Sequence, residues 1–307
     1  MIGTIGIALA VLIGVPVTAP GPEGALAGTF LDAGQGSPVV LIIPGSGPTD
    51  RDGNNPMGIT AAPYKLLAEA LAAKGVSSVR VDKRGMFGSK AAVADANKVT
   101  MTDYAGDVHS WAAAIRKQTN AKCVWVLGHS EGALVALIAA QQPRDICGLI
   151  LVSGAGRKLS EVIREQLRSN PANAPVLDEG MSALDTLDRG EHVDVTNMNP
   201  ALLPLFRPQV QDYLIDMFRQ DPAKLAGSTK LPMLIVQGER DVQTTVADAK
   251  ALATGQPKAK LVLIPRMNHV LKDVQTDDRA ANLATYADPS LPVDTTAVDV
   301  IASFVKR

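Results

Sequence analysis

The chain has 307 residues, of which 46% are hydrophobic and 20% are charged, and this composition excludes an intrinsically disordered or fibrous protein. Its 30 basic and 31 acidic side chains leave a formal net charge of −1, and no cluster of Lys or Arg stands out. A nucleic-acid-binding surface normally shows a basic excess, so we expect no nucleic-acid partner. The length suits one principal domain with an insertion.

An apolar run opens the sequence, from Ile2 to Val17, and Ala25-Leu26-Ala27 before Gly28 supplies the small-x-small pattern of a signal-peptidase site. We interpret residues 1–27 as a signal peptide that is cleaved near Ala27, and we expect an exported protein, periplasmic or extracellular. The alternative is an uncleaved anchor, because no Lys or Arg precedes the run. Any membrane contact would then be limited to this segment.

Six short apolar runs predict strands that are buried on both faces, because each contains mostly Val, Ile and Leu without polar alternation. Longer segments between them have a helical pattern. The strands are expected at residues 39–43, 76–81, 124–127, 149–152, 233–236 and 261–264, and the helices at 63–74, 101–119, 132–142, 246–254 and 296–305. This alternation predicts an α/β fold with a mostly parallel central sheet flanked by helices.

The alternation stops between residues 157 and 229, where helical patterns occur at 159–168 and 208–220 with no strand between them. An ordinary crossover is one explanation, but this segment is much longer than the single helix that a crossover needs. We therefore interpret residues 157–229 as an inserted helical cap. The α/β core then comprises residues 28–156 and 230–307.

The two cysteines, Cys123 and Cys147, each begin one of the apolar runs. If those runs are neighbouring parallel strands, the two sulfur atoms start at the same edge, roughly 5 Å apart. A disulfide is then possible in an exported protein. Two buried free thiols are an equally good interpretation of the sequence.

The segment Gly128-His129-Ser130-Glu131-Gly132 lies between an expected strand and an expected helix. It matches the G-x-S-x-G nucleophile elbow, in which a strained turn exposes the serine hydroxyl. The glycines are required because the strand and the helix approach each other closely there. A plain strand-to-helix turn is the alternative, but the context favours Ser130 as a nucleophile.

A serine hydroxyl needs a base that is oriented by a carboxylate. Of the four histidines, His129 would point away from its neighbour Ser130, His109 falls inside a helix, and His192 belongs to the cap. His269 remains, just past the strand at 261–264, and active sites of such sheets gather at the carboxyl ends of strands. The sequence therefore predicts His269 as the base.

The acid is expected in a loop after an earlier strand. Asp241 follows the strand at 233–236, and Ser130, Asp241 and His269 then have the order of nucleophile, acid and base that is typical of α/β-hydrolases. Glu239 lies too close to the preceding turn, and Asp273 follows the base. Asp241 is therefore the preferred candidate.

Acyl transfer also requires backbone N–H groups that stabilise an oxyanion. We predict one from Glu131 and the other from Ser46, in the loop after the first expected core strand, where Gly45 and Gly47 permit close approach. This loop lacks the third glycine of a dinucleotide motif, and the sequence contains no P-loop and no spaced Cys or His pairs. We expect no cofactor and no metal.

Four further segments carry a family resemblance, namely 45–54, 82–85, Gly238-x-x-Asp241 and Asn268-His269. With the elbow, they make the chain resemble the serine aminopeptidase-like branch of the α/β-hydrolase superfamily, which includes many bacterial esterases, from about residue 28 to the C-terminus. Gly85 and Gly88 are spaced more widely than in many relatives, which implies a reshaped loop.

Asp50, Arg51, Asp52 and Asn54 form a polar cluster beside the predicted oxyanion loop. Contact with the substrate is one possible role. We prefer a second role, in which these residues pair with each other or with Arg84 and hold the loop.

The triad and the resemblance together imply a serine hydrolase with the α/β-hydrolase fold. We expect a carboxylesterase that cleaves small acyl esters through an acyl-enzyme, with a small-molecule ester as its partner. A serine peptidase and an acyltransferase would use the same groups, and a non-catalytic binding protein on this fold is the remaining alternative.

Overall fold

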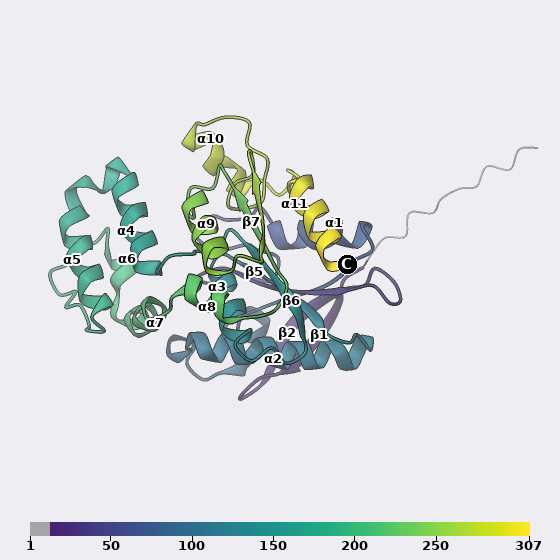
Figure 1. Ribbon diagram of the computed structural model, residues 1–307. Coiled ribbons are helices and arrows are strands. Elements are labelled where there is room, and N and C mark those ends of the chain that lie inside the picture. Colours follow the sequence, from purple (N-terminus) through teal and green to yellow (C-terminus); the bar gives the residue numbers. More distant parts are fainter. Residues whose placement is uncertain (1–12) are drawn as a thin grey trace, which may run out of the picture.

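The computed structural model describes residues 13–307 and is built around an eight-stranded sheet with the order β1-β2-β4-β3-β5-β6-β7-β8 (Figure 1). The strands are β1 (Val15–Pro20), β2 (Ala25–Leu31), β3 (Val39–Ile43), β4 (Ser77–Val81), β5 (Val124–His129), β6 (Ile146–Val152), β7 (Met233–Gly238) and β8 (Lys260–Ile264). β2 runs antiparallel to β1 and to β4, and all other pairs are parallel. The expected mostly parallel α/β fold is confirmed.

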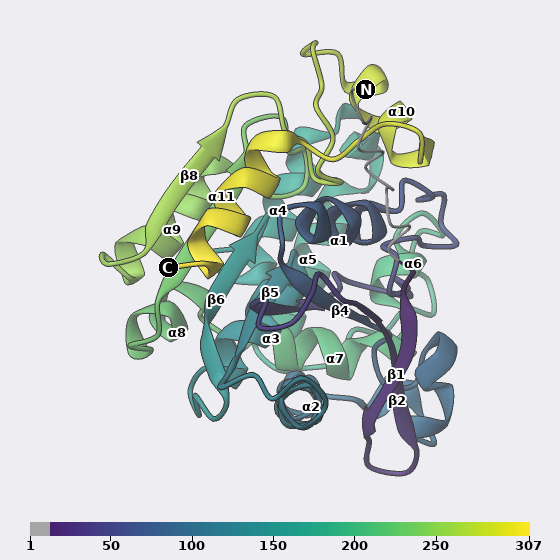
Figure 2. The ribbon, with the colours of Figure 1, turned by 90° about the vertical axis from the view of Figure 1, so that its right-hand side faces the viewer.

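Helices cover both faces of the sheet (Figures 1 and 2). Those that pack against it are α1 (Pro63–Ala73), α2 (Met101–Thr119), α3 (Glu131–Ala139), α9 (Val246–Gly255) and α11 (Thr295–Val305). Successive strand residues face opposite sides: Leu41 belongs to the core under α2, α3 and α9, whereas Ile42 belongs to the core under α1 and α11. The near-continuous Val, Ile and Leu runs of the central strands follow from this two-sided burial.

The insertion between β6 and β7 forms a helical cap beside the sheet, drawn in teal and green in Figure 1. Its helices are α4 (Leu159–Ser169), α5 (Leu177–Asp188), α6 (Leu203–Phe206), α7 (Pro208–Phe218) and α8 (Pro222–Ser228). Of these, α8 packs against the core helices α3 and α9. The remaining short helices are η1 (Phe87–Ala92), η2 (Ala96–Lys98), η3 (Pro171–Val176), α10 (Arg279–Ala284) and η4 (Thr285–Ala287).

The cleavage position expected near Ala27 falls within the sheet. That residue lies inside β2, where its backbone carbonyl accepts a hydrogen bond from the N–H of Asp82 at 3.0 Å, and its neighbour Leu26 is fully buried. Cleavage there would remove all of β1 and part of β2 from the sheet. Most of the apolar run that suggested a signal peptide lies outside the described residues, and export stays a prediction.

The sulfur atoms of Cys123 and Cys147 form a disulfide that joins the amino-terminal ends of the neighbouring strands β5 and β6. The Cα atoms of the two residues are 5.1 Å apart. This agrees with the distance expected across a parallel ladder and decides between the two interpretations of the sequence. Within residues 13–307, no helix combines the length and the apolar character needed to cross a bilayer.

Candidate active site

Ser130 occupies a strained turn between β5 and α3, with φ of 54° and ψ of −119°. A positive φ is unfavourable for a residue with a side chain, so the surrounding packing must hold it. A Cβ atom on Gly128 would lie 2.1 Å from the carbonyl oxygen of Gly132, and a Cβ on Gly132 would lie 2.4 Å from that of Ile43. The two glycines are therefore needed for the reason that the sequence suggested.

Asp241 and His269 lie together at the carboxyl ends of β7 and β8. His269 Nδ1 is 2.8 Å from Asp241 Oδ2, and both side chains are almost completely buried. The carboxylate also accepts hydrogen bonds from the backbone N–H groups of Gln243 and Thr244 at 2.8 and 3.0 Å. Burial alone would raise the pKa of Asp241, but His269 and these N–H groups outweigh it and hold the pKa below its usual value.

No hydrogen bond joins the nucleophile to the base among the described residues. Ser130 directly follows His129, whose ring centroid is 4.8 Å from that of His269. In the described part of the chain, Ser130 Oγ makes no hydrogen bond of standard geometry. Its hydroxyl lines a cavity, and catalytic hydrogen bonds often tighten only when a substrate is present.

His129 does not line that cavity, and its two nitrogens are both engaged. Nε2 is 2.8 Å from the backbone carbonyl of His269, and Nδ1 is 2.8 Å from the hydroxyl of Tyr64. Burial, followed by the neighbouring His269, lowers the pKa of His129 to about 3. A neutral ring must then donate from Nε2 to the carbonyl and accept the Tyr64 proton at Nδ1.

The other candidate bases and acids lie elsewhere. His109 is inside α2, and His192 is exposed in the cap with Asp212 at 2.7 Å. Glu239 and Asp273 are both exposed. None of these four side chains makes a hydrogen bond or an ion pair with Asp241 or His269.

The predicted oxyanion loop packs directly against the nucleophile, because a Cβ on Gly45 would lie 3.2 Å from that of Ser130. The N–H of Gly45 is already used, since it donates to Tyr64 Oη at 3.0 Å. The N–H groups of Ser46 and Glu131 donate no hydrogen bond within residues 13–307, and both residues line the cavity. These two amides are therefore available to an oxyanion.

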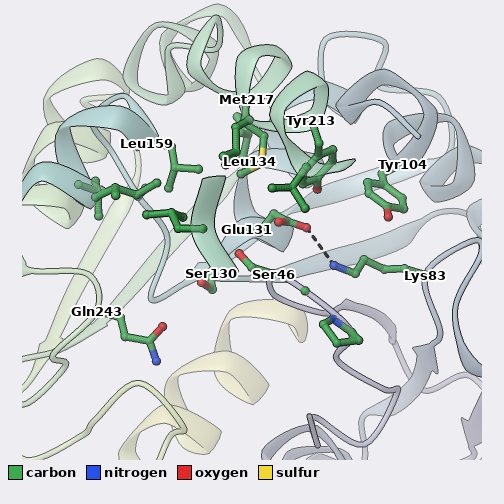
Figure 3. Close-up of a pocket in the computed structure, with 18 of the residues that line it drawn as sticks. Ser46, Lys83, Tyr104, Ser130, Glu131, Leu134, Leu159, Tyr213, Met217 and Gln243 are labelled. Atoms are coloured by element: carbon green, nitrogen blue, oxygen red, sulfur yellow. Dashed lines mark hydrogen bonds and ion pairs between the residues drawn. The ribbon is translucent and has the colours of Figure 1, made fainter. Parts of the chain in front are cut away.

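Lys83 connects the two segments that carry these amides. Its Nζ lies 2.8 Å from the carbonyl oxygen of Gly45 and 3.0 Å from Glu131 Oε1 (Figure 3). Only 4% of the Lys83 side chain and 2% of the Glu131 side chain are exposed, so this is a buried ion pair. Lys83 lies in a segment that suggested the family, but its contacts could not be read from the sequence.

The cavity lies between the cap and the core and has a volume of about 510 Å³. Lys83, Tyr104, Glu131 and Tyr213 form one polar group in its lining (Figure 3). Apolar side chains from the cap and from α3 form another part of the lining: Leu134, Leu159, Val162, Ile163, Leu205, Val210, Leu214 and Met217. Further polar side chains also line the cavity, namely Asn97, Arg157, Gln166, Arg207, Gln209, Gln243 and Thr244. Such a site can hold a largely apolar molecule with a few polar groups.

The polar cluster beside the oxyanion loop holds that loop in place. Arg51 donates to Asp82 through its backbone N–H at 2.9 Å and also through its guanidinium, while Asp52 pairs with Arg80. The expected pairing with Arg84 is not found, because that guanidinium binds carboxylates of α2 instead, including that of Asp107 at 2.6 Å. Within the described residues, no group of three or more His, Cys, Asp or Glu side chains is arranged to hold a metal ion.

Comparison with known proteins places this arrangement in a family. The family model described as serine aminopeptidase, S33, matches residues 57–274, which include Ser130, Asp241 and His269. The chain belongs to this family. The assignment agrees with the resemblance found in the sequence and with the α/β-hydrolase architecture.

Among curated proteins, esterase EstD of Thermotoga maritima is 27% identical over 245 residues, which cover 76% of this chain and 54% of the relative. The chain thus spans about half the length of that protein. Solved structures share the fold at low identity. The Pyrococcus furiosus esterase Pf2001 matches with a TM-score of 0.62 and 17% identity over 96% of this chain and 91% of its own. The α/β-hydrolase GrgF from Penicillium matches with a TM-score of 0.63 and 18% identity over 96% and 99%.

Proposed function

We propose that this member of the serine aminopeptidase S33 family is a carboxylesterase that cleaves small esters through an acyl-enzyme. The observation that carries the proposal is the buried Asp241–His269 pair beside a strained Ser130 whose hydroxyl opens into the cavity. Esterase is also the name of the curated relative and of a structural neighbour.

In this mechanism Ser130 Oγ attacks the ester carbonyl carbon and transfers its proton to His269 Nε2. The Nδ1–H of His269 donates to Asp241, which fixes the tautomer and stabilises the imidazolium. The amides of Ser46 and Glu131 stabilise the oxyanion. The alcohol leaves with the proton from His269, and a water molecule that His269 deprotonates then attacks the acyl-enzyme and regenerates Ser130.

The cavity favours an esterase over an aminopeptidase. An aminopeptidase needs a carboxylate for the substrate's α-ammonium group. Of the residues that line the cavity, Glu131 alone is acidic, and Lys83 neutralises it. Acyl transfer to an alcohol instead of water would use the same groups, and product analysis with added alcohols distinguishes the two outcomes.

The decisive experiment replaces Ser130 with Ala and measures turnover of an aryl ester and of an amino-acid anilide. We expect the variant to fold normally and to lose on the order of 10⁶-fold in kcat for the ester, as for serine hydrolases whose triad acts as a unit. Ser228→Ala, at an exposed position on α8, is the matched control. A fluorophosphonate probe should label the wild type and the control but not Ser130→Ala. Unchanged esterase activity in Ser130→Ala would contradict the proposal.

We further propose that the protein is exported. The Cys123–Cys147 disulfide supports this, because disulfides persist mainly in oxidising compartments. Fractionation of the producing cells tests the proposal, and recovery of the protein in the cytoplasm with two reduced thiols would refute it.

A further inference from the structure

We propose that Lys83 is a positioning residue that orients and polarises the peptide group that supplies one oxyanion donor. The proposal rests on the function proposed above. It starts from the buried Lys83 ammonium, which lies 2.8 Å from the carbonyl oxygen of Gly45. That carbonyl and the N–H of Ser46 belong to the same peptide group.

A trans peptide group is planar, and its C=O and N–H bonds point in opposite directions. Fixing the Gly45 carbonyl on Lys83 therefore also fixes the direction of the Ser46 N–H. The preceding N–H, that of Gly45, is held by Tyr64 Oη at 3.0 Å. The loop is thus fixed on both sides of Gly45, and the N–H of Ser46 is left free to bind the oxyanion.

The positive charge of Lys83 has a second effect. A cation that binds a peptide carbonyl draws electron density from the amide and strengthens its N–H as a donor, as in other chains of polarised hydrogen bonds. This effect is largest where water is excluded, and Lys83 and Glu131 are both buried. The Ser46 amide should therefore bind a developing negative charge better than an ordinary backbone amide.

Lys83 also reaches the other donor. Its second bond is to Glu131 Oε1 at 3.0 Å, and the backbone N–H of Glu131 is the second predicted oxyanion donor. One ammonium group thus holds together the loop after β3 and the start of α3. The distance between the two donors depends on this bridge.

The test must separate loss of the bridge from the cost of an unpaired buried charge, which destabilises proteins strongly. We therefore compare the double variant Lys83→Met/Glu131→Gln with the single variant Glu131→Gln. The single variant keeps the Lys83 ammonium and its bond to Gly45 but removes its counter-charge. The double variant removes the bond to Gly45 together with both charges, so any cost of the unpaired ammonium falls on the single variant and not on the double variant. Thermal unfolding midpoints establish that both variants fold.

Relative to Glu131→Gln, the double variant should lose about 10- to 100-fold in kcat with a nearly unchanged KM, because the effect is confined to the transition state. Its affinity for a trifluoromethyl ketone, which forms an oxyanion on Ser130, should fall in parallel. Equal kcat in the two folded variants would overturn the inference. Failure of the proposed function is seen separately, as activity that survives in Ser130→Ala.

A different observation, two tyrosine hydroxyls at the cavity, supports a second inference. Tyr104 on α2 and Tyr213 on α7 line the cavity, and their rings pack edge to face with centroids 6.2 Å apart. In the described part of the chain, neither hydroxyl makes a hydrogen bond of standard geometry, and that of Tyr213 is completely buried beside the Glu131 carboxylate. Burial, followed by Glu131, raises the pKa of both tyrosines, so both hydroxyls keep their protons.

Of the two hydroxyls, that of Tyr213 is the one that is buried without a hydrogen bond of standard geometry within the described residues. A hydroxyl in that state costs about 1–3 kcal/mol, which a ligand that accepts its hydrogen bond recovers. We infer that the preferred esters carry a hydroxyl or ketone oxygen on the part that fills the cavity. This inference also rests on the proposed function, and it names a substrate class that the apolar lining alone would not favour.

Matched pairs of esters test it. The nitrophenyl esters of 4-oxopentanoate and pentanoate differ on the acyl side, and acetates of a keto alcohol and of the corresponding alkyl alcohol differ on the leaving side. In one of the two pairs, we expect the wild type to prefer the oxygenated ester at least tenfold in kcat/KM, as in sites built to bind a polar group. Tyr104→Phe and Tyr213→Phe should each reduce that ratio. A ratio near one in both pairs, or a ratio that both variants keep, would overturn the inference even if Ser130→Ala is inactive.

Discussion

Removal of the Cys123–Cys147 disulfide should lower the stability of the protein by an amount that follows from its position in the sequence. The two cysteines are 24 residues apart, and cross-linking them restricts the unfolded chain. For a loop of this length, the chain-entropy relation predicts that the cross-link lowers the entropy of the unfolded chain by about 12 cal/mol/K, which stabilises the folded protein by about 3.5 kcal/mol at 25 °C. With an unfolding entropy of about 2.1 cal/mol/K per residue, this corresponds to a fall of about 5 °C in Tm.

The assay compares thermal unfolding of the wild type with that of Cys123→Ala/Cys147→Ala, each with and without reductant. Reductant should lower the Tm of the wild type and leave that of the variant unchanged. Esterase activity well below the transition should be the same, because the disulfide and Ser130 lie at opposite ends of β5. Equal transition midpoints for the variant and the oxidised wild type would refute the reasoning.

Three further predictions concern the site. Gly128→Ala should destabilise the protein by about 1–3 kcal/mol or more and lower kcat, because the added Cβ would lie 2.1 Å from the carbonyl oxygen of Gly132. An unchanged Tm and unchanged kinetics would contradict this prediction. Asp241→Asn should lower kcat by about 10⁴-fold, because His269 is then no longer held in the tautomer that can accept the Ser130 proton at Nε2. A pH–rate profile like that of the wild type would count against this prediction. The free energy of unfolding should fall by about 2 kcal/mol from pH 7.5 to pH 5, because His129 stays neutral when folded, with a pKa of about 3, but takes up a proton below about pH 6.5 when unfolded. Denaturant titrations should show a shallower pH dependence for His129→Gln than for the exposed control His192→Gln, and equal slopes would refute the assignment.

The central strands could be predicted from the sequence because they are buried on both faces. The run at residues 39–43 matches β3 at both ends, and the other five expected strands are found within three residues of their predicted limits. β1 and β2 were missed for a physical reason. They form an antiparallel edge in which β1 is mostly exposed and contains Pro16 and Pro20, and its apolar residues were interpreted as part of a signal peptide.

The triad candidates could be named from the sequence because each follows a recognisable strand, and chain order then assigns their roles. The groups that hold the triad candidates in place could not be named from the sequence. Tyr64 lies in an ordinary amphipathic helix, and nothing in its neighbourhood indicates that its hydroxyl reaches Gly45 and His129. Such contacts depend on how α1 packs against the sheet, which no local pattern encodes.

His129 shows why those contacts matter for the proposed chemistry. It adjoins Ser130 in the same turn, yet its ring points into the core and donates to the backbone carbonyl of His269. The position of the base loop is thus set by the residue next to the nucleophile, and Tyr64 extends the same chain of hydrogen bonds to the oxyanion loop at Gly45. A substitution at His129 would therefore displace the three loops relative to one another without removing any reacting group. The strained turn consequently has two functions: it exposes the Ser130 hydroxyl, and it fixes the loops around it.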